Sequence, residues 1–270
     1  MKPRDYAWWA ALLGLALFIW LRDRSWMGTS EDTVPLLIAM PLAWWLGRPW
    51  NLRETSEFLH LPLVVLAAAS LVLGSLLNIT LLLALGWTAS LWAWLRPRLD
   101  LGDRARVFGL MALPLMAFPW VALDGQPIGW WFRLSGAWFA EHFFRGFGFS
   151  VTREGTSMMV QGTPVTVDAA CSGLKVLQSL LIAGTFLAYV QFARTALYWW
   201  NVVALVGVAW LANTARIVVI TAAAMTWGQE FAMGVFHTWG GLLVLVLMFI
   251  ICGVTFEVER RWLLNQSPAA

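Results

Sequence analysis

The chain has 270 residues, of which 60% are hydrophobic and only 12% are charged. A soluble domain carries about 25% charged residues, so this composition excludes an ordinary soluble protein and indicates a membrane protein with several spans. The net charge of +3 comes from basic residues spread over short loops, so we expect no nucleic-acid partner. The 20 tryptophans, several of them in pairs near the ends of apolar runs, favour rings at the two bilayer interfaces.

Apolar runs along the chain predict an all-α membrane protein with about eight transmembrane helices in a single polytopic domain, residues 1–270. The expected spans are 7–21, 33–47, 58–78, 79–95, 107–123, 172–190, 196–226 and 236–256. The first run lacks the small-residue cleavage site of a signal peptide, so we expect it to remain as a span. The third and fourth runs nearly fuse at Asn78, which predicts a tight turn there.

The distribution of basic residues predicts the orientation in the membrane. With the N-terminus inside, most lysines and arginines fall in inside segments, as the positive-inside rule requires. Both termini are therefore expected in the cytoplasm. This topology places the starts of the sixth and eighth helices, and the outer half of the seventh, at the outer face.

A long outside segment, residues 124–170, separates the fifth and sixth runs. Residues 128–147 mix many aromatic side chains with a few charged ones, which predicts a helix lying in the membrane interface. Residues 149–167 contain turn signals at Gly155 and Gly162, which predict a small β-hairpin or meander. We interpret the whole segment as an outside lip that guides an extended peptide to the helix that follows.

Three residues of catalytic type fall at the predicted outer face. Cys171 directly precedes the sixth run, Arg216 lies inside the seventh, and His237 stands at the start of the eighth. A thiol nucleophile, a fixed cation and a proton carrier are the minimum set for acyl transfer. Each residue also has a structural interpretation: a cysteine or histidine of this kind can serve packing or capping, and the arginine can be a counter-ion.

Arg216 is the most informative of the three, because a charge near the centre of a span costs about 2.5–3.5 kcal/mol and needs a polar cavity or a partner. Asp168 or Glu230 could be that partner. Asn213 lies one helical turn before Arg216 and could share its cavity. Gly241, after His237, could allow a close helix approach.

The two cysteines are not expected to form a disulfide. Cys171 is expected at the same membrane depth as His237, and Cys252 lies much deeper in the last run than His237. The two cysteines are then too far apart, because a disulfide needs Cα atoms within about 7 Å. Cys171 is thus expected to be a free thiol and Cys252 a packing residue. A lone thiol argues against dithiol redox chemistry, and we expect neither metal nor cofactor. Ser172 is a conceivable nucleophile, although the thiol has the lower intrinsic pKa.

Three short blocks carry a resemblance to a known family. Residues 170–174, 213–217 and 237–241 resemble the A-C-S-G, N-x-x-R and H-x-x-x-G blocks of the exosortase/archaeosortase family, in the same order. The motif-bearing helices span residues 171–256. The resemblance implies catalytic and supporting residues as follows: Cys171, Arg216 and His237 catalytic, with Asn213, Ser172, Gly173, Asp168 and Gly241 as substrate-binding or supporting residues.

The resemblance also implies an activity and a location. Such an enzyme is a membrane cysteine protease or transpeptidase of the bacterial inner membrane, with its active site on the periplasmic side. Its substrates are membrane-anchored exported proteins with a C-terminal sorting signal, made of a short motif such as Pro-Glu-Pro, a transmembrane helix and a basic tail. Cleavage passes through a thioester on the cysteine.

Two other classes of function remain as alternatives. A transporter or channel-like protein could place Arg216 in an anion path, but it predicts polar residues in several spans, and the first five runs have almost none. If the protein is a non-enzymatic subunit of an envelope-assembly complex, replacing Cys171 by alanine should leave its function unchanged.

Overall fold

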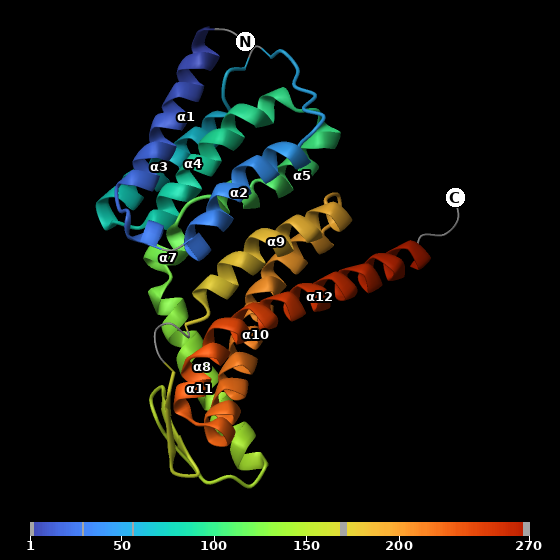
Figure 1. Ribbon diagram of the computed structural model, residues 1–270. Coiled ribbons are helices and arrows are strands. Elements are labelled where there is room, and N and C mark those ends of the chain that lie inside the picture. The colour runs from blue at the N-terminus through green and yellow to red at the C-terminus, as the bar shows by residue number, and fades with distance from the viewer. Residues whose placement is uncertain (1–2, 29, 56, 168–171, 267–270) are drawn as a thin grey trace. The chain divides into compact units, whose positions relative to one another are not determined.

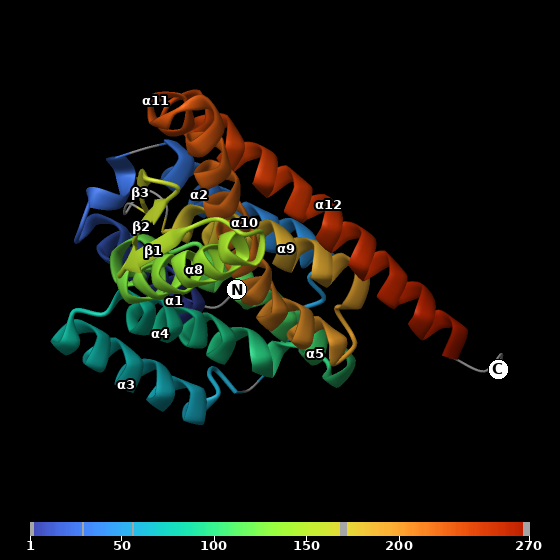
Figure 2. The same ribbon diagram turned by 90° about the horizontal axis from the view of Figure 1, so that it is seen from below.

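A computed structural model of the chain describes residues 3–28, 30–55, 57–167 and 172–266, with the backbone alone at 30–32, 229, 233, 235–238, 241 and 264–266. The described chain is mostly helical and carries one small antiparallel sheet (Figures 1 and 2). It divides into two compact units, the first made of residues 1–124 with 192–198 and the second of 125–191 with 199–270. Whether they act as one polytopic domain stays a prediction.

The first unit is built from short and medium helices. Its elements are α1 (Pro3–Leu21), η1 (Ser25–Gly28), α2 (Ser30–Leu46), α3 (Leu61–Leu77), α4 (Thr80–Leu95), η2 (Arg96–Arg98), α5 (Leu101–Leu110), α6 (Ala112–Met116) and α7 (Trp120–Asp124).

The predicted tight turn between α3 and α4 is confirmed. Asn78 adopts a left-handed conformation with φ of 57°, and its N–H donates to the carbonyl of Gly74. A side chain on Gly74 would lie 2.9 Å from the backbone nitrogen of Leu83, so this glycine lets the two helices approach. Figure 2 shows them side by side as a hairpin.

The expected span over residues 107–123 is wrong as a single helix. The structure divides this run among α5, α6 and α7. Two prolines explain the breaks, because Pro114 and Pro119 cannot donate a backbone hydrogen bond and their rings disfavour a continuous helix. The run is apolar, but apolar composition does not by itself make a continuous span.

Three described helices are long and apolar enough to cross a membrane, covering Leu174–Phe192, Leu197–Trp227 and Leu242–Leu263. The second run forms a helix despite its two prolines, but its apolar part, Thr33–Leu46, is short, as is Leu61–Leu77. Eight spans are therefore not confirmed by the described residues. The three clear candidates are the helices that carry or follow the sequence motifs.

The second unit contains these helices, an amphipathic helix and the sheet. Its elements are α8 (Gln126–Gly146), β1 (Val151–Glu154), β2 (Ser157–Val160), β3 (Thr163–Thr166), α9 (Leu174–Phe192), α10 (Leu197–Trp227), α11 (Gln229–Met233) and α12 (Val235–Gln266). The first two residues of α10 belong to the first unit.

The predicted interfacial segment is confirmed as a helix, α8, and the hairpin is a three-stranded meander in the order β1-β2-β3. Gly155 and Gly162 both have positive φ in the two turns, as the turn signals predicted. Val151 pairs with Val160, and Met158 pairs with Val165. One face of the meander is thus apolar.

The apolar face of the meander packs against α8 and α10. This core consists mainly of Val151, Met158, Val160, Val165 and Val167 from the meander and its end, Ala137, Ala140 and Phe144 from α8, and Ile217, Ile220, Ala223 and Ala224 from α10. The predicted lip is therefore a packed part of the second unit, docked on the helix that carries Arg216.

Candidate functional site

The structure describes part of the predicted site. Cys171 and Asp168 lie outside the described residues. His237 and Gly241 lie in α12 with their backbone alone described; His237 falls in the first turn of this helix, at the position the sequence predicted. The other predicted residues are described in the second unit, namely Ser172, Gly173, Asn213 and Arg216.

The segment after Cys171 contacts the helix that carries Arg216. Gly173 has φ of +74° and directly precedes α9, whose first turn begins with the bond from the Leu177 N–H to the Gly173 carbonyl, 2.8 Å. A Cβ built on Gly173 would lie 2.7 Å from Cγ of Asn213. Only glycine fits this place, because it tolerates positive φ and adds no atom at the contact. The first two motif blocks therefore meet in space.

The same segment also contacts the start of α8. A Cβ on Gly129 would lie 2.9 Å from Cβ of Ser172 and 3.2 Å from a methyl group of Leu174. Residues 172–174 thus contact both α8 and Asn213 of α10. The backbone immediately after the predicted nucleophile is therefore packed against two helices.

Asn213 is the most unusual buried residue of this region. Its side chain is 0% exposed, and neither its amide nitrogen nor its amide oxygen has a hydrogen-bond partner within the described parts of the chain. Leaving a buried polar group unsatisfied costs about 1–3 kcal/mol, and such groups in native proteins are few. The amide therefore has both a donor and an acceptor available for a group that enters the site.

Polar groups cluster around Asn213 on α10. Arg216, one turn later, is 9% exposed, and Thr214 is 3% exposed. Their burial shows that this stretch of α10 faces the protein rather than lipid. That Arg216 and Asn213 share one polar cavity stays a prediction.

Two contacts fix α10 against α8 at this level. The indole N–H of Trp210 donates to Oγ of Ser135 over 2.8 Å. A Cβ on Gly136 would lie 2.6 Å from Cδ1 of Ile217, so the glycine allows the two helices to approach closely. These contacts hold the stretch of α10 from Trp210 to Ile217 against α8.

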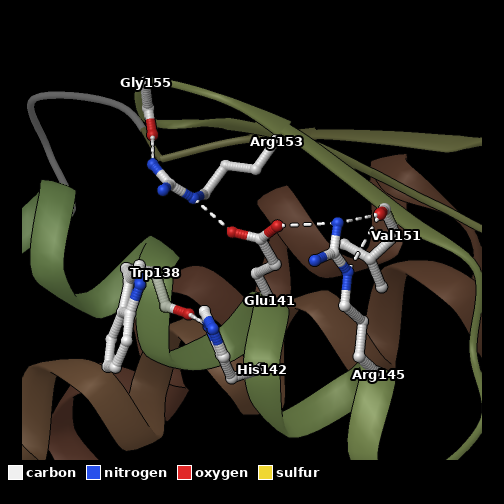
Figure 3. A network of polar contacts seen from close by, with 7 residues as sticks. All are labelled: Trp138, Glu141, His142, Arg145, Val151, Arg153 and Gly155. Atoms are coloured by element: carbon white, nitrogen blue, oxygen red, sulfur yellow. Dashed lines mark hydrogen bonds and ion pairs between the residues drawn. The ribbon is translucent and has the colours of Figure 1, made fainter.

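Glu141 of α8 forms two ion pairs, one within the helix and one with the meander (Figure 3). Its carboxylate accepts a bond from Nε of Arg153 on β1 at 2.6 Å and pairs with Arg145 of α8 at 2.9 Å. Arg145 also donates to the carbonyl of Val151 over 2.9 Å. The hydrogen bond from Arg153 lowers the pKa of Glu141, so the carboxylate stays charged although it is buried. The network thus locks β1 onto α8.

The last helix is linked to α10 and packs on α9. Asn201 donates to the carboxylate of Glu259 over 2.9 Å, and a Cβ on Gly253 would make ordinary contact with Leu187 at 3.8 Å. Cys252 is 3% exposed, which confirms its predicted packing role. No group of three or more metal-ligating side chains is found within the described ranges.

The sequence did not predict the ion-pair network of Glu141 or the contact between Gly173 and Asn213. The Glu141–Arg145 spacing of one helical turn was a readable signal for an ion pair, but nothing in the sequence linked Glu141 to Arg153. The contact between Gly173 and Asn213 had no local signal either, since the two residues lie far apart in the chain.

A comparison with known families bears on this geometry. The family model described as Transmembrane exosortase (Exosortase_EpsH) matches residues 4–254, which is nearly the whole chain. Searches of curated proteins and of solved structures returned no match. The match extends through the first unit, where the sequence showed only apolar runs, and it includes all three motif blocks. The chain belongs to the transmembrane exosortase family.

Proposed function

We propose that this exosortase is a membrane cysteine protease or transpeptidase that uses Cys171 to cleave the C-terminal sorting signals of membrane-tethered exported proteins. The observation that carries the proposal is the contact of Gly173 with Asn213. Gly173 is two residues from Cys171 in the chain, and Asn213 is one helical turn from Arg216. This contact supports the proposal that the thiol and the buried polar side chains of α10 act in one site.

The proposed reaction is a two-step acyl transfer. His237 takes the proton of the Cys171 thiol, and the thiolate attacks the scissile carbonyl carbon. The carbonyl oxygen becomes an oxyanion that accepts hydrogen bonds from Arg216. The peptide C–N bond then breaks as His237 returns the proton to the leaving nitrogen, and a thioester remains on Cys171. Water or an amine attacks the thioester and releases the thiol.

Asn213 has a defined place in this scheme. Its side-chain amide is buried, its Cγ and Oδ1 face Gly173, and neither its N–H group nor its oxygen has a partner among the described residues. A donor that is fixed before the reaction stabilises a developing oxyanion more than a donor that must first reorient. We assign Asn213 as a second donor to the substrate carbonyl, beside Arg216.

The substrate and the location follow the same proposal. The substrate presents a short motif at the outer face of the bacterial inner membrane, followed by its own transmembrane helix and a basic tail in the cytoplasm. Both termini of the enzyme then face the cytoplasm. The meander, packed on α8 and α10, is a rigid surface along which an extended substrate segment could approach Cys171.

The test is co-expression with candidate proteins that carry a C-terminal sorting signal, with cleavage followed by the change in substrate mass. Cys171→Ser is expected to abolish cleavage while the protein accumulates normally. Cys252→Ser, the matched control at a buried packing position, should cleave as wild type. Cleavage by the Cys171→Ser variant would refute the cysteine mechanism.

A second variant separates catalysis from architecture at Arg216. Lysine keeps the charge but lacks the planar fork that can hold an oxyanion through two N–H groups. If Arg216 acts in the transition state, Arg216→Lys should insert and accumulate but lose roughly 10²–10³ in rate. Near-normal cleavage by this variant would assign Arg216 a structural role, and would leave Cys171 and His237 as a dyad.

A further inference from the structure

We propose that the first unit binds one anionic glycerophospholipid, with an acyl chain in a tryptophan-lined cavity and the phosphate beside a neighbouring group of arginines. This inference concerns a part of the chain that the proposed cleavage does not use. It rests on two adjoining cavities of opposite chemistry, both lined only by residues of the first unit.

The larger cavity has a volume of about 610 Å³. It is lined by α1, α2, the segment after α2, α4 and the stretch where α5 ends and α6 begins. This volume lies within the range of about 300–1,000 Å³ that is typical of ligand pockets. Its walls hold no charged residue and are rich in indole rings, namely those of Trp9, Trp20, Trp44, Trp50, Trp87 and Trp94.

The walls of this cavity offer few free polar groups. Four of the indole N–H groups are already bonded within the protein. Trp20 donates to the carbonyl of Ala117, Trp50 to that of Trp44 and Trp87 to that of Leu12. Trp94 donates to the carboxylate of Asp5. A buried water needs two to four polar partners, which such walls do not offer. The occupant must therefore be a hydrocarbon, and in a membrane protein the abundant hydrocarbon is a lipid acyl chain.

A transmembrane helix of a substrate is a poorer match to this space. A helix about 10 Å across fills roughly 80 Å³ per ångström of its length, so the 610 Å³ cavity would take only about 8 Å of it. A flexible, narrow chain is the better match to the volume.

The smaller cavity, of about 170 Å³, adjoins the first and shares its lining residues Leu52 and Trp94. Arginines 4, 53 and 98 line it, together with Asp5, Glu54 and Thr55. Arg98 is buried and forms an ion pair with Asp5 at 2.8 Å, so its charge is already balanced. The other two arginines are the ones that can meet a ligand.

Arg4 is the strongest candidate for a phosphate contact. Its guanidinium lies 4.7 Å from the centre of the Phe58 ring, and no described carboxylate forms an ion pair with it. Arg53 forms an ion pair with Asp100 at 2.6 Å, but its side chain is 73% exposed and can turn to a second anion. The guanidinium group binds phosphate oxygens through paired N–H donors.

The predicted orientation places these arginines at the cytoplasmic leaflet, which carries the anionic lipids. Basic pockets between membrane helices on that side bind anionic headgroups. A ligand with a hydrocarbon end in the tryptophan cavity and a phosphate at Arg4 is therefore a phospholipid of that leaflet.

The experiment is native mass spectrometry of the purified full chain in mild detergent, with phosphatidylglycerol or phosphatidylcholine of identical acyl chains added. The wild type should retain one phosphatidylglycerol in preference to phosphatidylcholine. Arg4→Gln should lower that preference roughly fivefold, as expected for about 1 kcal/mol per basic residue at an anionic surface. Arg24→Gln is the matched control, since Arg24 is exposed and does not line the cavity.

A second pair of variants tests the acyl-chain cavity. Ala43 lines the cavity and is 6% exposed, so Ala43→Leu fills part of the space and should lower retention of both lipids. Ala10→Leu adds the same atoms at an exposed position of α1 and should retain lipid as wild type does. Equal retention by the two leucine variants, or an unchanged preference in Arg4→Gln, would overturn the proposal.

A measurement on the wild type alone covers the case in which Ala43→Leu does not fold. Phosphatidylglycerol with brominated acyl chains should quench tryptophan emission in a saturable phase complete near one lipid per protein. Quenching that rises only in proportion to added lipid would contradict a single site. Neither measurement depends on cleavage, so a failure here leaves the proposed protease activity untouched, and the reverse also holds.

Discussion

Replacing Gly173 by alanine tests the contact on which the candidate site depends. Two costs arise. An L-residue at φ of +74° costs about 1–2 kcal/mol. The added Cβ would lie 2.7 Å from Cγ of Asn213, and relieving such an overlap in a packed region costs about 1–3 kcal/mol. Gly173→Ala is therefore expected to lower the free energy of unfolding by roughly 2–5 kcal/mol.

Gly148→Ala is the matched control. Gly148 has φ of +83°, but a Cβ there would have nothing within 4 Å, so the variant bears the backbone cost alone. The loss of unfolded-state entropy is common to both variants and cancels in their difference. The contact itself should then appear as a difference of about 1–3 kcal/mol between the two variants.

The assay is unfolding by dodecyl sulfate in mixed micelles, followed by helical circular dichroism. Adding Asn213→Ala to the Gly173→Ala chain removes Cγ and the amide, so the double variant should recover part of the loss through a coupling of about 0.5–3 kcal/mol. Equal destabilisation by Gly173→Ala and Gly148→Ala, with no coupling to position 213, would show that the two motif blocks do not meet.

Three further outcomes are expected. Asn213→Leu removes an unsatisfied buried amide and should raise the free energy of unfolding by about 1–3 kcal/mol while lowering cleavage; full cleavage would exclude Asn213 as a carbonyl donor. Glu141→Gln should speed amide hydrogen exchange in the meander. Because the hydrogen bond from Arg153 lowers the pKa of Glu141, its stabilisation is complete above the ordinary value of 4.5 and is lost as the pH falls through the lowered value. The protection of the meander amides, taken relative to the intrinsic exchange rate at each pH, should therefore fall toward that of the variant in acidified wild type, and protection that stays constant below that value would contradict this role. Trp210→Phe removes the bond to Ser135 and should cost about 1 kcal/mol in the same unfolding assay, and an unchanged midpoint would contradict it.

The sequence by itself determined much of the local structure of the second unit. The turn signals at Gly155 and Gly162 predicted the meander, because they mark backbone positions where a side chain is disfavoured. The apolar run after Gly173 predicted α9, and the one that contains His237 predicted the last helix. The ordered motif blocks also indicated the exosortase family, which the family comparison then confirmed.

The break in the run from 107 to 123 shows where apolar composition is insufficient. A window of hydrophobic residues predicts burial or membrane insertion, but continuity of a helix depends on every backbone N–H in its interior finding a carbonyl. Pro114 and Pro119 interrupt that series, and the structure has three short helices in place of one span.

Only the tertiary structure decided which surfaces meet. A helix that is apolar nearly all round, such as α10, has no hydrophobic stripe from which its neighbours could be predicted. The contact of Gly173 with Asn213 and the ion pair of Glu141 with Arg153 join residues from different elements, and each depends on side-chain shape and distance rather than on sequence spacing. The sequence could name the polar residues of α10, but their burial beside the start of α9 follows from how the helices pack.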